Sequence, residues 1–184
     1  AVRGLSVFVT LTFAVIVFPV PDAPEIPATS DFVTSMNFEI TNFSAYEDGT
    51  TVYYSIDGGD AKEYTAPFAI TTSCKIVAYA VNDGNESAKA TATYTRIAKD
   101  PVINVLGDAN ADAFEGSIEV EIATENGATA YYTLNGEDPT IESTKYEEKL
   151  TIKATATLKV IAIEAGEYKS GIETQEFIMA ISGN

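Results

Sequence analysis

The chain has 184 residues, 46% of them apolar and 21% charged, so it can bury one large or two small cores and is not expected to be disordered. Its formal net charge of −16 argues against binding to nucleic acid or to an anionic membrane surface, because both need a basic face. It has no histidine and a single cysteine, Cys74, which excludes a Ser-His-Asp triad, a Cys-His dyad, a histidine-ligated metal and a disulfide within the chain.

Alternating apolar and polar residues recur along most of the sequence. Long windows with apolar residues at i, i+3, i+4 and i+7 are missing, and valine, isoleucine, threonine and tyrosine are abundant. The pattern therefore predicts an all-β protein.

Residues 1–20 form the first predicted element, an orphan β-strand that is apolar on both faces. Strand alternation places six apolar side chains on one face: Val7, Val9, Leu11, Phe13, Val15 and Val17. Leaving about a dozen apolar side chains of this strand in water would forgo on the order of 10 kcal/mol, so it must pair with a partner. We expect that partner to be a neighbouring subunit or an upstream domain, because the later repeats already have full strand sets.

Four interpretations of residues 1–20 compete. A signal-peptide core could follow Arg3, and a transmembrane helix would need about 20 apolar residues without Pro19 and with fewer β-branched side chains. Residues 6–13 align with residues 87–94, a closing strand, which favours a remnant of a preceding repeat. The missing polar face favours a donor strand that joins subunits through residues 5–18. The last two interpretations fit the sequence best, and both stay open.

Self-comparison divides the rest of the chain into two repeats, residues 21–98 and 101–184. The matching pieces are 51–58 with 129–136, Tyr64 with Tyr146, 75–78 with 159–162, Gly84 with Gly166, and Ser87 with Ser170. Only Lys99 and Asp100 separate the repeats, which is too short for a flexible tether.

Each repeat contains about seven short predicted strands, which is typical of an Ig-like Greek-key β-sandwich. Asp57-Gly58 and Asn135-Gly136 predict two-residue hairpin turns, because such turns need positive φ at both central residues. Cys74 begins an apolar strand and is expected to be a small buried side chain. The predicted fold is thus two tandem sandwiches plus the N-terminal orphan strand.

The second repeat carries a family resemblance. Its segment ATAYYTLNGEDPT at residues 128–140, followed by Tyr146 and by residues 158–166, resembles the chitobiase/β-hexosaminidase C-terminal repeat. The first repeat departs from this pattern, with Gly59-Asp60-Ala61 in place of the Asp-Pro-Thr step. The resemblance implies an Ig-like or fibronectin III-like accessory module of secreted or surface-anchored bacterial proteins. It transfers no active site, because catalysis in such proteins belongs to other domains.

An acidic loop in the second repeat is a candidate calcium site. Asp108, Asn110 and Asp112, with Glu119 further on, have the spacing of oxygen ligands in a calcium loop. Ala113 occupies the position where that loop needs glycine, and a strand would hold Glu119 differently from a helix. An ordinary solvated loop is the favoured interpretation, and calcium the alternative.

Tyr53 and Tyr131 are candidate ligand contacts, because alternation turns them away from the predicted cores, where they could stack on sugar rings. Cross-strand pairing on the outer face of a sheet is the favoured alternative. The lack of tryptophan weakens the carbohydrate interpretation further.

These features predict a non-catalytic structural, spacer or adhesion module of an extracellular or surface-exposed bacterial protein. Two alternatives remain. The first is a pilus-like filament subunit that polymerises by donor-strand exchange. The second is an accessory carbohydrate-binding module of a glycosidase.

Overall fold

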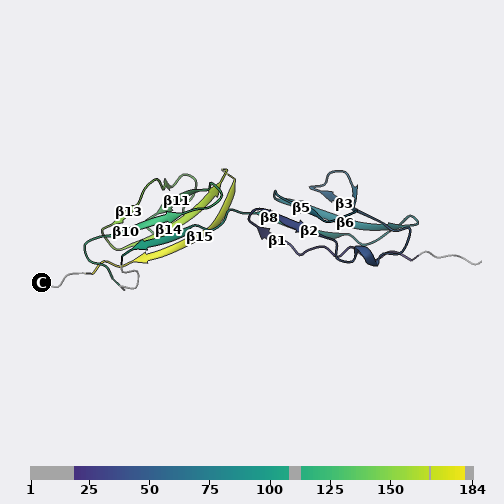
Figure 1. Cartoon of the computed structure of the whole chain (residues 1–184), viewed down its shortest axis with the longest axis horizontal. Helices are drawn as coiled ribbons and strands as arrows, with labels where there is room; N and C mark the ends of the chain where they lie inside the picture. The colour runs from purple at the N-terminus through teal and green to yellow at the C-terminus, as the bar shows by residue number, and fades with distance from the viewer. Residues whose placement is uncertain (1–18, 108–112, 166, 181–184) are drawn as a thin grey trace, which may run out of the picture. The chain divides into compact units, whose positions relative to one another are not determined.

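A computed structural model of the chain describes residues 19–107, 113–165 and 167–180 (Figure 1). Within these ranges nearly all regular structure is β-strand, and the one helical element is a 3-10 turn, η1 (Phe43–Ala45). The predicted all-β class with sandwiched sheets is confirmed. Residues 1–18 of the predicted orphan strand, including Val7, Val9, Leu11, Phe13, Val15 and Val17, lie outside the described residues.

The first repeat contains a large and a small sheet. The large sheet has the order β1 (Ser30–Phe32), β8 (Ala90–Arg96), β6 (Cys74–Asn82), β3 (Thr51–Ile56) and β4 (Lys62–Glu63), with β7 (Asn85–Glu86) also paired to β6. β1 runs parallel to β8, whereas β6 is antiparallel to β3. The small sheet consists of β2 (Met36–Phe38) antiparallel to β5 (Phe68–Ile70).

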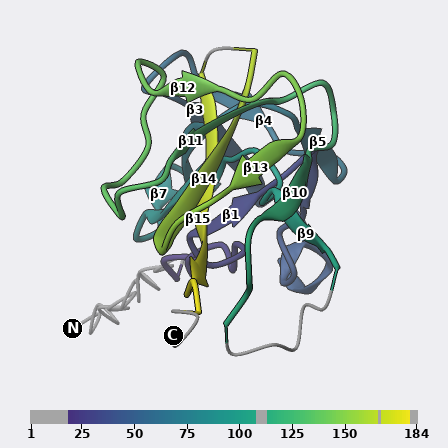
Figure 2. The same cartoon turned by 90° about the vertical axis from the view of Figure 1, so that its left-hand side faces the viewer.

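The second repeat is built from two antiparallel sheets. One has the order β12 (Thr144–Lys145), β11 (Thr129–Thr133), β14 (Ala156–Glu164) and β15 (Tyr168–Phe177). The other has the order β13 (Leu150–Ile152), β10 (Ile118–Ala123) and β9 (Val102–Leu106). Figure 2 shows β14 beside β15 and β13 beside β10, as the strand pairing requires.

Buried side chains lie between the two sheets of each repeat. In the second repeat the core joins both sheets and is mainly aliphatic: Val120, Ile122, Ala130, Ile152, Leu158, Val160 and Phe177. In the first repeat, Phe38 of the small sheet contacts Tyr94 of the large sheet edge to face, with ring centroids 6.0 Å apart. The Cys74 thiol is buried and in no disulfide, as its place in an apolar strand predicts.

The predicted hairpin turn is present in the first repeat and wrong in the second. Asp57 and Gly58 both have the expected positive φ (52° and 73°), and the Gly59 amide donates to the Ile56 carbonyl (2.9 Å), although β4 begins only at Lys62. In the second repeat only Gly136 has positive φ, because the Asn135 side chain accepts a hydrogen bond from the Glu137 amide (3.1 Å) and forms an Asx turn instead.

By packing, the described residues fall into two compact units. Residues 19–27, 39–67 and 76–92 form the first unit, and the remaining described residues form the second. The repeat boundaries at 98 and 101 stay predictions. In the part of the chain that the structure describes, no helix is long and apolar enough to cross a lipid bilayer.

Candidate functional site

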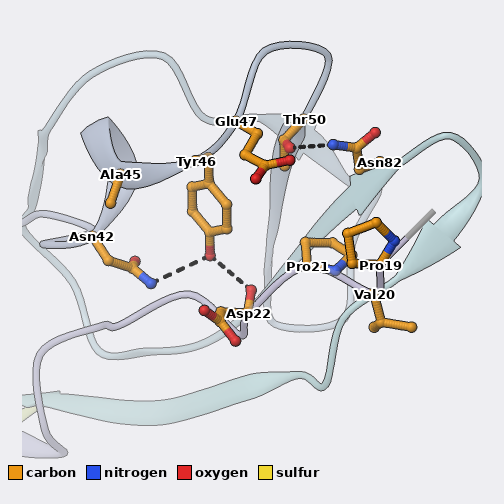
Figure 3. A pocket seen from close by; sticks show the side chains of 10 residues that line it. All are labelled: Pro19, Val20, Pro21, Asp22, Asn42, Ala45, Tyr46, Glu47, Thr50 and Asn82. Atoms are coloured by element: carbon orange, nitrogen blue, oxygen red, sulfur yellow. Dashed lines mark hydrogen bonds between the residues drawn. The ribbon is translucent and has the colours of Figure 1, made fainter.

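A pocket in the first unit gathers polar side chains from segments that are far apart in the sequence (Figure 3). It has a volume of about 340 Å³ and is lined by Pro19, Val20, Pro21, Asp22, Asn42, Ala45, Tyr46, Glu47, Thr50 and Asn82. The lining residues come from the segment that precedes β1, from η1 and the loop that follows it, and from the end of β6. The pocket thus depends on loop conformation more than on strand alternation.

Side-chain hydrogen bonds fix these loops. The Tyr46 hydroxyl donates to the backbone carbonyl of Asp22 (3.0 Å), and the Asn42 amide group donates to the Tyr46 hydroxyl (3.5 Å) and to the carbonyl of Ala23 (3.1 Å). The Asn42 side-chain oxygen accepts the amide of Glu25 (2.9 Å). Figure 3 shows the Tyr46 hydroxyl between Asn42 and Asp22. Asn42 therefore ties the segment before β1 to the loop around η1.

The electrostatic environment of the pocket is negative. Burial raises the pKa of the Tyr46 hydroxyl, and the Asp22 and Glu25 carboxylates raise that pKa further, while the hydrogen bond from Asn42 opposes the shift. Tyr46 therefore stays a neutral hydroxyl at physiological pH, where it positions the loops and does not act as a base.

The two predicted tyrosines have different surroundings. Tyr53 stacks on Tyr79 across β3 and β6, with ring centroids 5.5 Å apart and planes at 26°, and the Lys89 ammonium lies 5.2 Å from the Tyr79 centroid. Tyr131 is paired with Ile161 across β11 and β14. One ring face of Tyr53 is thus covered by Tyr79, and an arriving sugar could stack only on the other.

The candidate calcium ligands Asp108, Asn110 and Asp112 lie outside the described residues. Among residues 19–107, 113–165 and 167–180, no group of three or more Asp, Glu, Cys or His side chains could hold a metal ion. Calcium binding by the acidic loop stays a prediction.

Sequence reasoning missed an ion pair in the second unit. Arg96, at the end of β8, pairs with Glu164 of β14, and their side chains are only 20% and 13% exposed. The Arg96 guanidinium also lies 4.4 Å from the centroid of the Tyr168 ring. An arginine at a strand end gives no signal of such a partner, because the two residues are 68 positions apart.

The same unit anchors the residues that follow Arg96. The amide of Ala98 donates to the carbonyl of Lys169 (3.3 Å), and the amide of Gly171 donates to the Asp100 carboxylate (2.7 Å). A Cβ at position 171 would lie 2.9 Å from that carboxylate oxygen, so a larger residue there would displace the Asp100 side chain. Segment 96–100 is held by specific contacts with β14 and β15.

Two family profiles match the chain, one in each repeat. Residues 40–94 match the Fn3-associated domain, and residues 109–174 match the chitobiase/beta-hexosaminidase C-terminal domain. The predicted resemblance is confirmed. No curated protein matches the sequence.

Solved structures with related architecture are distant in sequence. A two-domain fibronectin type III segment of chicken tenascin is 14% identical, with 85% of this chain and 98% of the tenascin segment covered and a TM-score of 0.41. The fibronectin(III)-like modules of Clostridium thermocellum CbhA are 16% identical, with 84% and 93% covered and a TM-score of 0.30. Likenesses at these levels carry no conclusion about function.

Proposed function

We propose that this chain, which belongs to the chitobiase/β-hexosaminidase C-terminal domain family of β-sandwich repeats, is a structural spacer or adhesion module of a secreted or surface-exposed bacterial protein. Fn3-like domains of this kind are typically non-catalytic. The acidity of the chain, with a net charge of −16, suits a protein that stays soluble while exposed to the medium.

The anchoring of segment 96–100 is the observation that best supports a spacer. A module that separates other domains is effective only if its connecting segments resist bending, and a glycine-serine tether would not. Here Ala98 and Asp100 are hydrogen-bonded to β15, and Arg96 is paired with Glu164. These contacts hold segment 96–100 against β14 and β15 within the second unit, which supports the proposal.

Backbone ¹⁵N relaxation of the full chain tests this proposal. Amides 98–100 should have order parameters near 0.85, the value typical of rigid backbone, whereas values below about 0.6 would contradict a stiff spacer. Asp100→Ala removes one anchor and should lower the order parameters of its neighbours. Asp60→Ala, in an exposed loop of the first repeat, is the matched control and should leave them unchanged.

Cell-surface exposure can be tested separately. Antibodies raised against the purified chain should label intact producing cells without permeabilisation. Labelling that requires permeabilised cells would contradict the extracellular assignment.

The filament alternative depends on residues 5–18. Removing residues 1–18 and measuring sedimentation tests it directly, because a polymer held together by donor strands should dissociate to monomers. A polymer that survives the deletion would exclude strand donation.

The carbohydrate-binding alternative rests on the exposed ring face of Tyr53 and on Tyr131. A glycan array with the unaltered chain and with Tyr53→Ala and Tyr131→Ala tests it. Binding that is absent, or that both substitutions leave unchanged, would end this alternative.

A further inference from the structure

The dipeptide Asn-Gly occurs in the second repeat as Asn126-Gly127 and as Asn135-Gly136. In such a pair the glycine nitrogen can attack the carbonyl carbon of the asparagine side chain, because glycine has no Cβ to block the approach. The attack needs an asparagine side chain that can rotate toward that nitrogen, and a glycine amide that is not already hydrogen-bonded. The two pairs differ in both respects.

The Asn135 side chain and the Gly136 amide are both held by hydrogen bonds. The Asn135 side-chain amide group donates to a carboxylate oxygen of Glu137 (2.9 Å), and its oxygen accepts the backbone amide of Glu137 (3.1 Å). The Gly136 amide donates to the carbonyl of Thr157 (3.1 Å). These hydrogen bonds would have to break before Gly136 could attack Asn135.

The Asn126-Gly127 pair lies in an open turn between β10 and β11. Both residues are exposed and have positive φ (54° and 72°), as a type I′ turn requires, and a Cβ on Gly127 would meet no atom within 4 Å apart from its chain neighbours. Among the residues that the structure describes, none is hydrogen-bonded to the Asn126 side chain or to the Gly127 amide. The turn is closed around the pair by the Ala128 amide, which donates to the Glu125 carbonyl (3.0 Å).

We propose that Asn126 is a site of spontaneous deamidation, whereas Asn135 is protected by its hydrogen bonds. The Gly127 nitrogen gives its proton to a solvent base and bonds to Cγ of Asn126, while the Cγ–Nδ2 bond breaks and Nδ2 leaves as ammonia with a proton from the solvent. Water then opens the cyclic imide at either carbonyl, so that asparagine and water become aspartate or isoaspartate and ammonia. This modification site goes beyond the spacer function, which requires no modification.

Isoaspartate at position 126 would loosen the turn. Its backbone runs through Cβ, which adds one carbon to the chain between Glu125 and Ala128 and disturbs the hydrogen bond that closes the turn. In either product the new carboxylate also follows Glu125 directly in the chain, and the Glu125 carboxylate pairs with Lys99. Deamidation should therefore lower the melting temperature of the second repeat.

Incubation of the folded full chain in mildly alkaline buffer tests the proposal. Cleavage after glutamate releases peptide 126–137, which contains both asparagines, so mass spectrometry compares their deamidation within one fragment. Asn126 should be lost at least about tenfold faster than Asn135, because attack at Asn135 must first break hydrogen bonds. In the chain unfolded by urea, the two rates should become similar, because the dipeptide is the same.

Two substitutions test the protection of Asn135. Glu137→Ala removes the carboxylate that accepts its side-chain amide group and should speed deamidation of Asn135 about threefold, with the rate at Asn126 unchanged. Asp60→Ala makes the same change in net charge in an exposed loop of the first repeat and should leave both rates unchanged. Equal rates in the folded chain, faster loss of Asn135, the same ratio of rates in urea, or equal acceleration by Asp60→Ala would each overturn the proposal.

Discussion

The two repeats fill a similar strand pattern with different side chains. The first packs aromatic rings: Phe38 lies 5.0 Å from Phe68 and 6.0 Å from Tyr94, and Phe43 lies 4.9 Å from Tyr64, as measured between ring centroids. The second packs mainly aliphatic side chains, with Leu158 and Val160 fully buried. The interior of the sandwich can thus be filled either by aromatic rings or by aliphatic side chains.

Backbone hydrogen bonding, by contrast, is shared. The amides of Tyr64 and Tyr146 donate to the carbonyls of Val52 and Ala130 at equivalent positions. Near the end of the long central strand, the hydroxyls of Ser87 and Ser170 accept the amides of Ala80 and Ala162, at 2.9 Å in both repeats. The two repeats thus share a set of backbone hydrogen bonds, whereas the composition of their cores differs.

Truncating the cores should give the largest effects. Tyr94→Ala should lower the free energy of unfolding of the first repeat by about 4 kcal/mol, and Leu158→Ala that of the second by about 3 kcal/mol, through lost burial and the cavities left behind. Urea titrations followed by NMR signals from each repeat measure both. If each substitution destabilises both repeats equally, the two cores do not act separately and the comparison fails.

Breaking the Arg96–Glu164 pair should cost about 3 kcal/mol, because Arg96→Met leaves a mostly buried carboxylate without its partner. The double variant Arg96→Met/Glu164→Met should recover most of this loss. Lys99→Met is the matched control, since the Lys99–Glu125 pair is 49% and 60% exposed and should change stability by less than about 1 kcal/mol. Similar losses of unfolding free energy for Arg96→Met and Lys99→Met in urea titrations would contradict the greater stabilisation expected from the buried Arg96–Glu164 pair.

Alkaline pH should destabilise the first repeat through its aromatic core. Burial, with a smaller contribution from Cys74, raises the pKa of Tyr94 from 10.0 to about 12. The neutral hydroxyl is therefore favoured in the folded state, and its stabilising effect is complete below pH 10 and lost as the pH rises to about 12. The loss should reach between about 2 and 3 kcal/mol in urea titrations.

Tyr94→Phe isolates this titration. The variant should lose less stability than the unaltered chain between pH 10 and pH 12. An unchanged pH dependence would show that Tyr94 ionises as freely in the folded state as in the unfolded state.

Removing the shared serine hydroxyls should have smaller effects. Ser87 is buried and Ser170 is partly exposed, so Ser87→Ala should cost about 2 kcal/mol and Ser170→Ala about 1 kcal/mol, as an amide loses its acceptor. Amide hydrogen exchange at Ala80 and Ala162 measures the local part of each loss. Unchanged exchange in both variants would show that the serine hydroxyls do not protect the amides of Ala80 and Ala162.

Much of the fold could be predicted because strand alternation and internal repetition are local properties of a sequence. Val52 and Ala130 are buried, and Tyr53 and Tyr131 lie on the opposite faces of their strands, as alternation predicts. Further along the faces that carry Val52 and Ala130, the side chains are less buried: Ile56 and Leu134 are 36% and 41% exposed. How far a core extends depends on which element covers each strand end, which alternation does not encode.

The pocket and the ion pair could not be predicted in this way. Asp22, Asn42 and Asn82 come together across 60 positions because loops before and after the strands are held by side-chain hydrogen bonds. None of these residues forms a spaced motif, so a sequence pattern gives no reason to group them.

The sequence by itself determined the all-β class, the repetition and the family resemblance, because all three depend on residue order and periodicity within short windows. Only the tertiary structure decided which polar groups meet in the Tyr46 pocket and that Arg96 finds Glu164. Those contacts join residues distant in the sequence, and they form only once packing has fixed the strands that carry them.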